Sequence, residues 1–131
     1  FANHSTLAGH VVVENNVVIG ALSAVHQFTR IGEGAMIGGM SGVTADVIPF
    51  GTVVGNRAKL SGLNIIGLKR NNFDKTEISE LRKVFRFIFF EKKMTLNDRL
   101  NISVKKKYTF YTIRKLLKFL SDSSDRSFCL P

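Results

Sequence analysis

The chain has 131 residues, and a composition of 44% hydrophobic and 22% charged residues allows one folded domain or two small ones. The single cysteine, Cys129, excludes an internal disulfide, which fits a reducing cytosol. No segment reaches the roughly 18 consecutive apolar residues of a membrane-spanning helix, so stable membrane insertion is not expected.

The formal net charge of +9 belongs to the second half of the chain. Residues 1–66 hold three basic and three acidic side chains, whereas residues 67–131 hold sixteen basic and seven acidic ones. A field of that sign favours an acidic protein, an anionic membrane surface or a nucleic acid as partner. For any single lysine, an ordinary solvated helical face explains the charge equally well. No nucleic-acid-binding motif accompanies the charge, so we expect no nucleic acid partner.

The first half of the chain repeats every six residues. Aliphatic residues stand six places apart at Leu7, Val13, Ile19, Val25, Ile31, Ile37 and Val43. Small or hydroxyl residues follow four places later, at Ser23, Thr29, Ala35 and Ser41. This period fits neither a helix nor an array of hairpins, but it suits a chain wound into flat-sided coils with one inward aliphatic residue per side. Short strands that carry aliphatic residues in register by chance are the alternative.

Three sides per coil give eighteen residues per circuit, so residues 1–54 make three circuits. Phe1 takes an inward position in this frame, and Pro49 and Phe50 disturb it. Glycines are predicted to supply tight corners or close backbone approaches. They are Gly9, Gly20, Gly32, Gly38, Gly39, Gly42 and Gly51. Residues 56–63 are predicted to be a loop or a weaker last coil. Because the chain opens inside the repeat without a covering element, we expect a C-terminal fragment of a longer protein.

Three helices are predicted after the coils. Asp74 and Glu77 form a capping pair ahead of an apolar face, and Thr95 with Asp98 starts a shorter helix that runs to about residue 104. A third helix spans about residues 110–120. The segment 64–72 is predicted to be a connector, and the tail after Ser121 to be frayed. An aromatic cluster is interpreted as core or subunit contact rather than a binding site. It comprises Phe85, Phe87, Phe89 and Phe90.

Three stretches of the chain carry a family resemblance: TLAGHVVV at residues 6–13, AVHQF at residues 24–28 and GLNIIGLKR at residues 62–70. With the basic helical tail, they resemble the C-terminal half of the UDP-N-acetylglucosamine O-acyltransferase family. The resemblance implies a left-handed parallel β-helix over residues 1–66, which is an exception to right-handed crossovers. A helical domain would follow over residues 67–131. It also implies a homotrimer whose active sites lie between subunits.

The resemblance implies the function as well. Enzymes of this family move a 3-hydroxyacyl group from acyl carrier protein to the 3-hydroxyl of UDP-N-acetylglucosamine in the first step of lipid A synthesis, in the cytoplasm. The donor is a thioester on the carrier protein, so no cofactor is expected. A general base must take the proton of the attacking hydroxyl, and histidine suits this role near neutral pH. The family's base histidine precedes Phe1, so we expect this chain alone to be inactive.

Five site residues follow from matching positions in the coil. The resemblance assigns the Gly9 backbone N–H to the developing oxyanion and His10 to the sugar. His26 and Gln27 offer paired donors and acceptors for a sugar or nucleotide. Gly39 corresponds to the position that sets acyl-chain length, where a missing side chain leaves the groove open. The alternatives are ordinary corner glycines and surface histidines.

The GLNIIGLKR segment supplies the remaining site residues. Asn64 and Arg70 match nucleotide-contacting positions, and a guanidinium suits phosphate or a carbonyl-rich base edge. The sequence departs from the family pattern twice: Ile66 stands where an acidic ribose contact is usual, and Asn71 where a second arginine is usual. Lys69 is a candidate to compensate for the missing arginine.

Two other functions stay open. The first is the N-acyltransferase of the same pathway, which shares the coils, although residues 62–70 and the basic tail argue against it. The second is a non-catalytic remnant that serves as a module for trimer formation and carrier-protein binding. Cationic helices would attract the acidic carrier protein, but the sequence does not select the docking lysines. The scattered histidines give no metal-ligand spacing, so no metal site is expected.

Overall fold

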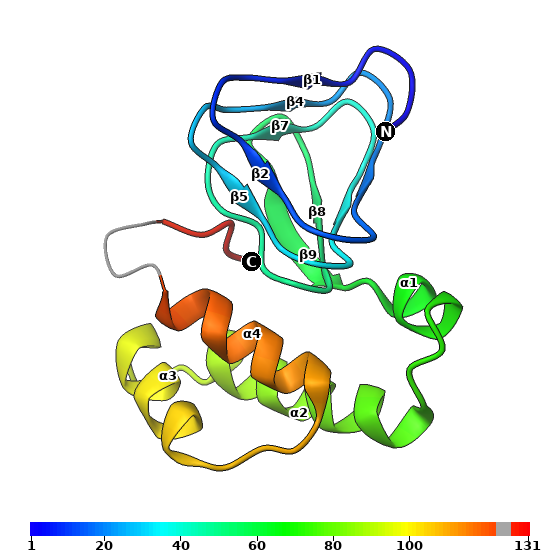
Figure 1. Cartoon of the computed structure of the whole chain (residues 1–131). Helices are drawn as coiled ribbons and strands as arrows, with labels where there is room; N and C mark the ends of the chain where they lie inside the picture. Colours follow the sequence, from blue (N-terminus) through cyan, green and yellow to red (C-terminus); the bar gives the residue numbers. More distant parts are fainter. Residues whose placement is uncertain (123–126) are drawn as a thin grey trace.

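The computed structural model describes residues 1–122 and 127–131. Its first part consists of short strands wound around a triangular interior, which we call the coil (residues 1–63), and Figure 1 shows it end-on. The strands are β1 (Thr6–Leu7), β2 (Val12–Val13), β3 (Val18–Ile19), β4 (Ala24–Val25), β5 (Arg30–Ile31), β6 (Met36–Ile37), β7 (Gly42–Val43), β8 (Gly51–Val54) and β9 (Lys59–Leu63).

The coil has three walls, each a separate sheet. Wall A contains β1, β4 and β7, wall B contains β2 and β5, and wall C contains β3, β6, β8 and β9. Partners in the first coils are parallel and eighteen residues apart, as in the pairing of Leu7 with Val25 and of Val13 with Ile31. This register confirms the predicted eighteen-residue circuit.

The six-residue positions fill the interior. Ile19, Ile31 and Ile37 are 0% exposed, which confirms their predicted inward direction. The small residues four places later are buried too, and Ser23 bridges coils by donating to the Gly38 carbonyl at 2.8 Å. Phe1 is the exception at 72% exposure, so its predicted inward position is wrong. No coil precedes it in the described residues to pack against its ring.

One residue at each corner of the first coils has left-handed backbone geometry. These residues recur every six places with φ of 58–68°: His4, His10, Asn16, Leu22, Phe28, Gly34 and Met40. Only Gly34 among them is glycine. The predicted corner glycines Gly9 and Gly39 do lie in corner turns, but one place before the left-handed residue, so the left-handed position itself does not need glycine. A residue with a Cβ loses about 1–2 kcal/mol in this region. Hydrogen bonds between coils offset this cost, such as the one from the Met40 N–H to the Ala21 carbonyl at 2.8 Å.

The predicted close approaches are confirmed at three other glycines. A Cβ on Gly20, Gly32 or Gly42 would lie 2.3–2.5 Å from backbone atoms of a neighbouring coil. Real Cβ atoms do not come so close, so these positions need glycine for space rather than for φ.

The last circuit loses two residues. Ile31 pairs with Val47 and Ile37 with Val53, which are sixteen residues apart. The shortening falls just before Pro49 and Phe50, where the sequence frame is disturbed. The chain then folds back, and β9 pairs antiparallel with β8. Residues 59–63 are therefore a strand, and their prediction as a loop or weaker coil is wrong.

In the part of the chain that the structure describes, four helices follow the coil: α1 (Ile65–Arg70), α2 (Lys75–Phe90), α3 (Leu96–Lys105) and α4 (Tyr111–Ser121). The two predicted capping pairs are confirmed, since the side chains of Asp74 and Thr95 accept the N–H groups of Glu77 and Asp98. The predicted connector at 64–72 is wrong, because Asn64 caps α1 by accepting the Gly67 N–H. In the aromatic cluster, Phe85 and Phe89 are buried, Phe87 is half-buried and Phe90 is exposed.

The helices pack below the coil (Figure 1), and polar contacts join the two. Arg30 on wall B forms a 2.9 Å salt bridge with Asp46 and donates to the Phe119 carbonyl of α4 at 3.1 Å. The final residues return to the coil, where Asp46 pairs with Phe128 and the Leu60 N–H donates to Leu130. The prediction of a frayed tail is wrong for residues 127–130, and its remainder falls on residues 123–126, outside the described residues. Within the described part, no helix is both long and apolar enough to cross a membrane.

Candidate functional site

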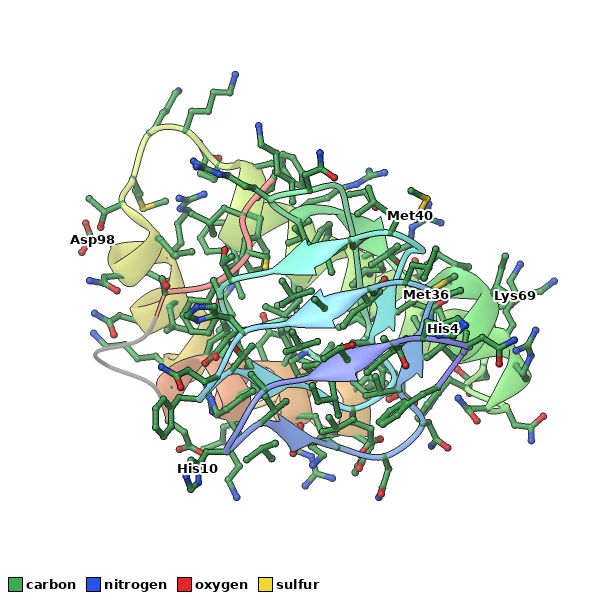
Figure 2. The ribbon with its side chains drawn as sticks, turned by 90° about the horizontal axis from the view of Figure 1, so that it is seen from above. His4, His10, Met36, Met40, Lys69 and Asp98 are labelled. Atoms are coloured by element: carbon green, nitrogen blue, oxygen red, sulfur yellow. The ribbon has the colours of Figure 1, made fainter. Side chains whose placement is uncertain are left out.

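Four predicted site residues gather where wall A meets wall B, which we call the A/B corner. Gly9 and His10 leave β1, and His26 and Gln27 leave β4 one coil later, so register places the two pairs side by side. All four are exposed. Figure 2 shows His10 at one end of wall A, with His4 and Met40 at the other end.

Neither the backbone conformation of Gly9 nor the space around it requires a glycine. Its φ lies outside the left-handed region, and a Cβ there would meet nothing within 4 Å. Its carbonyl accepts the Phe28 N–H at 3.1 Å, which fixes the peptide at the corner. Corner geometry therefore does not explain this glycine, and the open space is compatible with a ligand approaching the backbone.

Gly39 lies at the corner between walls C and A, one residue before the exposed Met40. A Cβ on Gly39 would lie 3.5 Å from the Ala21 carbonyl oxygen, an ordinary contact. A side chain at this position would therefore extend over the outside of the coil, as the acyl-length interpretation requires.

Asn64 and Arg70 line a hollow of about 410 Å³ between α1 and wall C. The outer side chains of Val18 and Met36 form the wall side of this hollow. Arg70 is exposed, and the departures from the family pattern, Ile66 and Asn71, lie on the same rim.

Asn64 is only 8% exposed, and both ends of its amide are engaged. Its Nδ2 donates to the Gly34 carbonyl at 3.0 Å, and its Oδ1 accepts the Gly67 N–H at 3.1 Å. A Cβ on Gly67 would clash with this side chain at 2.4 Å. The structure therefore gives Asn64 an anchoring role: it holds α1, and with it Arg70, against the coil.

One chain does not bring all the predicted residues together. Gly9, His10, His26 and Gln27 share the A/B corner, whereas Asn64 and Arg70 lie at the B/C corner and Gly39 at the C/A corner. The coil of a single chain therefore presents three separate partial sites, one at each corner.

Sequence reasoning missed a polar cluster between wall B and α4. The Tyr111 hydroxyl donates to Glu33 Oε1 at 2.7 Å, and Lys115 Nζ lies 3.7 Å from Glu33 and 3.8 Å from Glu14. The hydrogen bond to Glu33 is the main cause that raises the pKa of Tyr111 to about 12, with burial and the two carboxylates adding to it. Because Tyr111 is 78 residues from Glu33, no local pattern could have revealed the contact.

The described residues contain no group of three or more metal-ligating side chains. Cys129 is buried, and burial raises the pKa of its thiol. A second hollow, of about 420 Å³ between α3, α4 and the tail, is largely apolar and contains none of the predicted site residues.

Parallel strands in six-residue steps around three walls are the arrangement of the class of hexapeptide-repeat proteins. A family model described as "Udp N-acetylglucosamine O-acyltransferase; Domain 2" matches residues 46–129. The chain belongs to the UDP-N-acetylglucosamine O-acyltransferase family. The resemblance inferred from the sequence is thereby confirmed.

The similar proteins are about twice as long as this chain, and nearly all of this chain matches them. The acyl-(acyl-carrier-protein)–UDP-N-acetylglucosamine O-acyltransferase of Paracoccus denitrificans is 44% identical over 98% of the chain and 48% of that protein. Among solved structures, the Arabidopsis UDP-N-acetylglucosamine acyltransferase matches with a TM-score of 0.91 and 38% identity, covering 98% of this chain and 47% of that one. The UDP-N-acetylglucosamine acyltransferase of Campylobacter jejuni matches with a TM-score of 0.85 and 32% identity, and the match covers 98% of this chain and 48% of that one. The chain spans about half the length of these relatives.

Proposed function

We propose that this chain is the C-terminal half of a cytoplasmic O-acyltransferase that acts on UDP-N-acetylglucosamine at the start of lipid A synthesis. The observation that carries the proposal is the 44% identity over 98% of the chain to a relative named for this activity. The Gly9–His10 and His26–Gln27 pairs, which share one exposed corner, support it. In this proposal the coil is a left-handed parallel β-helix. The domain division after residue 66 stays a prediction.

The proposed reaction exchanges a thioester for an ester. The 3-hydroxyl of the sugar attacks the acyl carbonyl, a C–O bond forms, the C–S bond breaks, and the carrier thiol leaves with a proton. The Gly9 N–H stabilises the oxyanion that develops on the carbonyl oxygen. His10, His26 and Gln27 hold the sugar nucleotide, and the Gly39 corner leaves room for the acyl chain. The proton acceptor is assigned to none of the three histidines of this chain.

The separation of the partial sites supports a trimer with sites between copies. Residues at different corners of one coil point away from each other. Only a neighbouring copy of the chain can therefore place one of its walls against the A/B corner. The outer faces carry exposed apolar side chains that such contacts would cover. They include Val12, Val18, Leu22, Met36 and Met40. Acyl carrier protein is the proposed donor partner, attracted by the cationic helices.

The test uses the gene product that carries this chain, at its natural length. Incubation with UDP-N-acetylglucosamine and a 3-hydroxyacyl carrier protein should yield a sugar nucleotide with one ester-linked acyl group, detected by mass spectrometry. Acylation only of a glucosamine acceptor with a free amine would instead establish the N-acyltransferase. If the protein made in the cell begins at Phe1 and acylates neither acceptor, the chain is the non-catalytic module.

Arg70 gives the residue-level test. In the natural-length protein, Arg70→Ala should weaken UDP binding about tenfold in calorimetry, because it removes a charge-assisted contact with phosphate or base. Lys75→Ala is the matched control: Lys75 is equally exposed but does not line the hollow, so its removal should leave the affinity unchanged. Equal affinities for both variants and the unaltered protein would remove Arg70 from the site.

A further inference from the structure

The A/B corner contains an aromatic stack that the proposed chemistry does not use. The rings of His10 and Phe28 lie 5.0 Å apart between centroids, with only 3° between their planes. The two residues are eighteen places apart, so they occupy the same position on consecutive coils, and both have left-handed backbones. Both are exposed, and Phe28 keeps 55% of its surface accessible although it supports the His10 ring.

The C/A corner shows that coil geometry alone does not produce such a stack. His4 has the same φ of 59° as His10 and is also exposed. The residue eighteen places after it is Leu22, which offers no ring. The chain thus contains two histidines on equivalent corners, one with an aromatic support and one without. The difference lies in the side chain beneath.

Phe28 constrains the corner in two ways. Its ring covers one face of the His10 imidazole, and its N–H donates to the carbonyl of Gly9, the residue before His10. Among the described residues, no hydrogen bond engages either ring nitrogen of His10. With one face covered, the imidazole presents its edge, where both nitrogens lie, to whatever approaches the corner.

We infer that Phe28 is a positioning residue that holds the His10 imidazole edge-on to a polar ligand. The inference rests on the proposed function, in which that ligand is the hydroxyl- and amide-bearing sugar of a nucleotide sugar. A ring fixed in its binding orientation loses less conformational freedom when the ligand binds. From the usual strength of aromatic pairs, the stack should tighten sugar-nucleotide binding roughly three- to tenfold.

The stack itself is tested by nuclear magnetic resonance on the natural-length protein. Protons above the Phe28 ring are shielded, so His10 ring protons should resonate upfield of those of His4. In Phe28→Leu the His10 signals should move toward the His4 signals, whereas Phe28→Tyr, which keeps a ring, should preserve the shift. His10 signals that do not respond to Phe28→Leu would overturn the stack. Thermal unfolding of both variants checks that the coil is intact.

The positioning role is tested by a double-mutant cycle with UDP-N-acetylglucosamine as the calorimetric probe. Phe28→Leu should raise Kd roughly three- to tenfold, and Phe28→Tyr should restore it. In a His10→Ala background, Phe28→Leu should have no further effect. A full effect in that background, or none in the presence of His10, would overturn the inference. An unaltered protein that shows the ring-current shift but does not bind the probe would overturn the proposed function instead.

Discussion

The coil and the helices reach order by opposite means. Every strand of the coil is five residues long or shorter, and, apart from the antiparallel pair of β8 and β9, each strand pairs with one a full circuit away in the sequence. The helices instead begin at local caps, such as Asp74 with Glu77, and bury one face. A residue in a middle circuit of the coil therefore contacts the circuits before and after it as well as the interior. An exposed helical residue contacts its own helix and is otherwise open to solvent. Substitutions between coils should cost more than substitutions at helix ends.

The largest expected effect is at a contact between coils. Gly32→Ala places a Cβ 2.4 Å from the Pro49 backbone nitrogen, which cannot move without disturbing the next corner. The free energy of unfolding should fall by about 3 kcal/mol, as for a strained overpacked core. Chemical denaturation measures this loss.

Gly9→Ala is the matched control within the same coil. It adds the same methyl group where nothing lies within 4 Å, so the free energy of unfolding should change by less than about 0.5 kcal/mol. Similar losses at both glycines would show that backbone freedom, not space, determines stability in the coil.

A smaller effect is expected where two helices meet. The start of α4 has no side-chain cap of its own, and Glu77 of α2 accepts the Thr112 N–H at 2.9 Å. Glu77→Gln keeps the size but removes the charge that stabilises a helix N-terminus, so we expect a loss of about 1 kcal/mol in denaturation. Glu80→Gln on the same helix breaks a salt bridge with the exposed Lys83 and should lose less than half as much. Equal losses would contradict the capping role.

The smallest effect joins the two regions and depends on pH. Tyr111 has a folded-state pKa of about 12, above its ordinary value of 10, because it donates to Glu33. The hydrogen bond between Tyr111 and Glu33 therefore adds to the free energy of unfolding in full below pH 10, and this stabilisation is lost as pH rises from about 10 to about 12. Since Tyr111 is 41% exposed, we expect this contribution to be less than about 1 kcal/mol.

Absorbance at alkaline pH measures this prediction. In the unaltered protein one phenolate should form only near pH 12, and Tyr111→Phe should abolish that late step. The variant should also lose the extra alkaline sensitivity of its unfolding free energy between pH 10 and 12. A titration curve of the same shape in both proteins would show that the Glu33 contact does not hold the phenol in its protonated form.

The sequence predicts what repeats and what is local. The six-residue period gives the interior of the coil, because each step buries one aliphatic residue such as Ile19 or Ile31. Capping pairs give the starts of α2 and α3, because a cap involves residues only three places apart. The outward direction of His10 and His26 follows from the same frame.

The rest depends on contacts that no local pattern encodes. The two-residue shortening before Val47 is seen only in its pairing with Ile31 on the previous circuit, and the anchor of the short α1 is a contact from Asn64 to the Gly34 carbonyl, thirty residues earlier. The separation of the candidate site into three corners appears only when the walls are assembled. The stack of Phe28 on His10 needs the register of two coils, although eighteen-residue spacing between two aromatic rings was a signal that could have been sought.

The return of the tail to the coil orders events during synthesis. Asp46 receives backbone partners from Ser127 and Cys129, so the edge of the coil beside it stays open until some eighty further residues have been made. The ribosome must therefore synthesise all the residues from α1 to α4 before that edge closes. Until then, the nascent coil carries an unpaired rim that a neighbouring nascent chain can join.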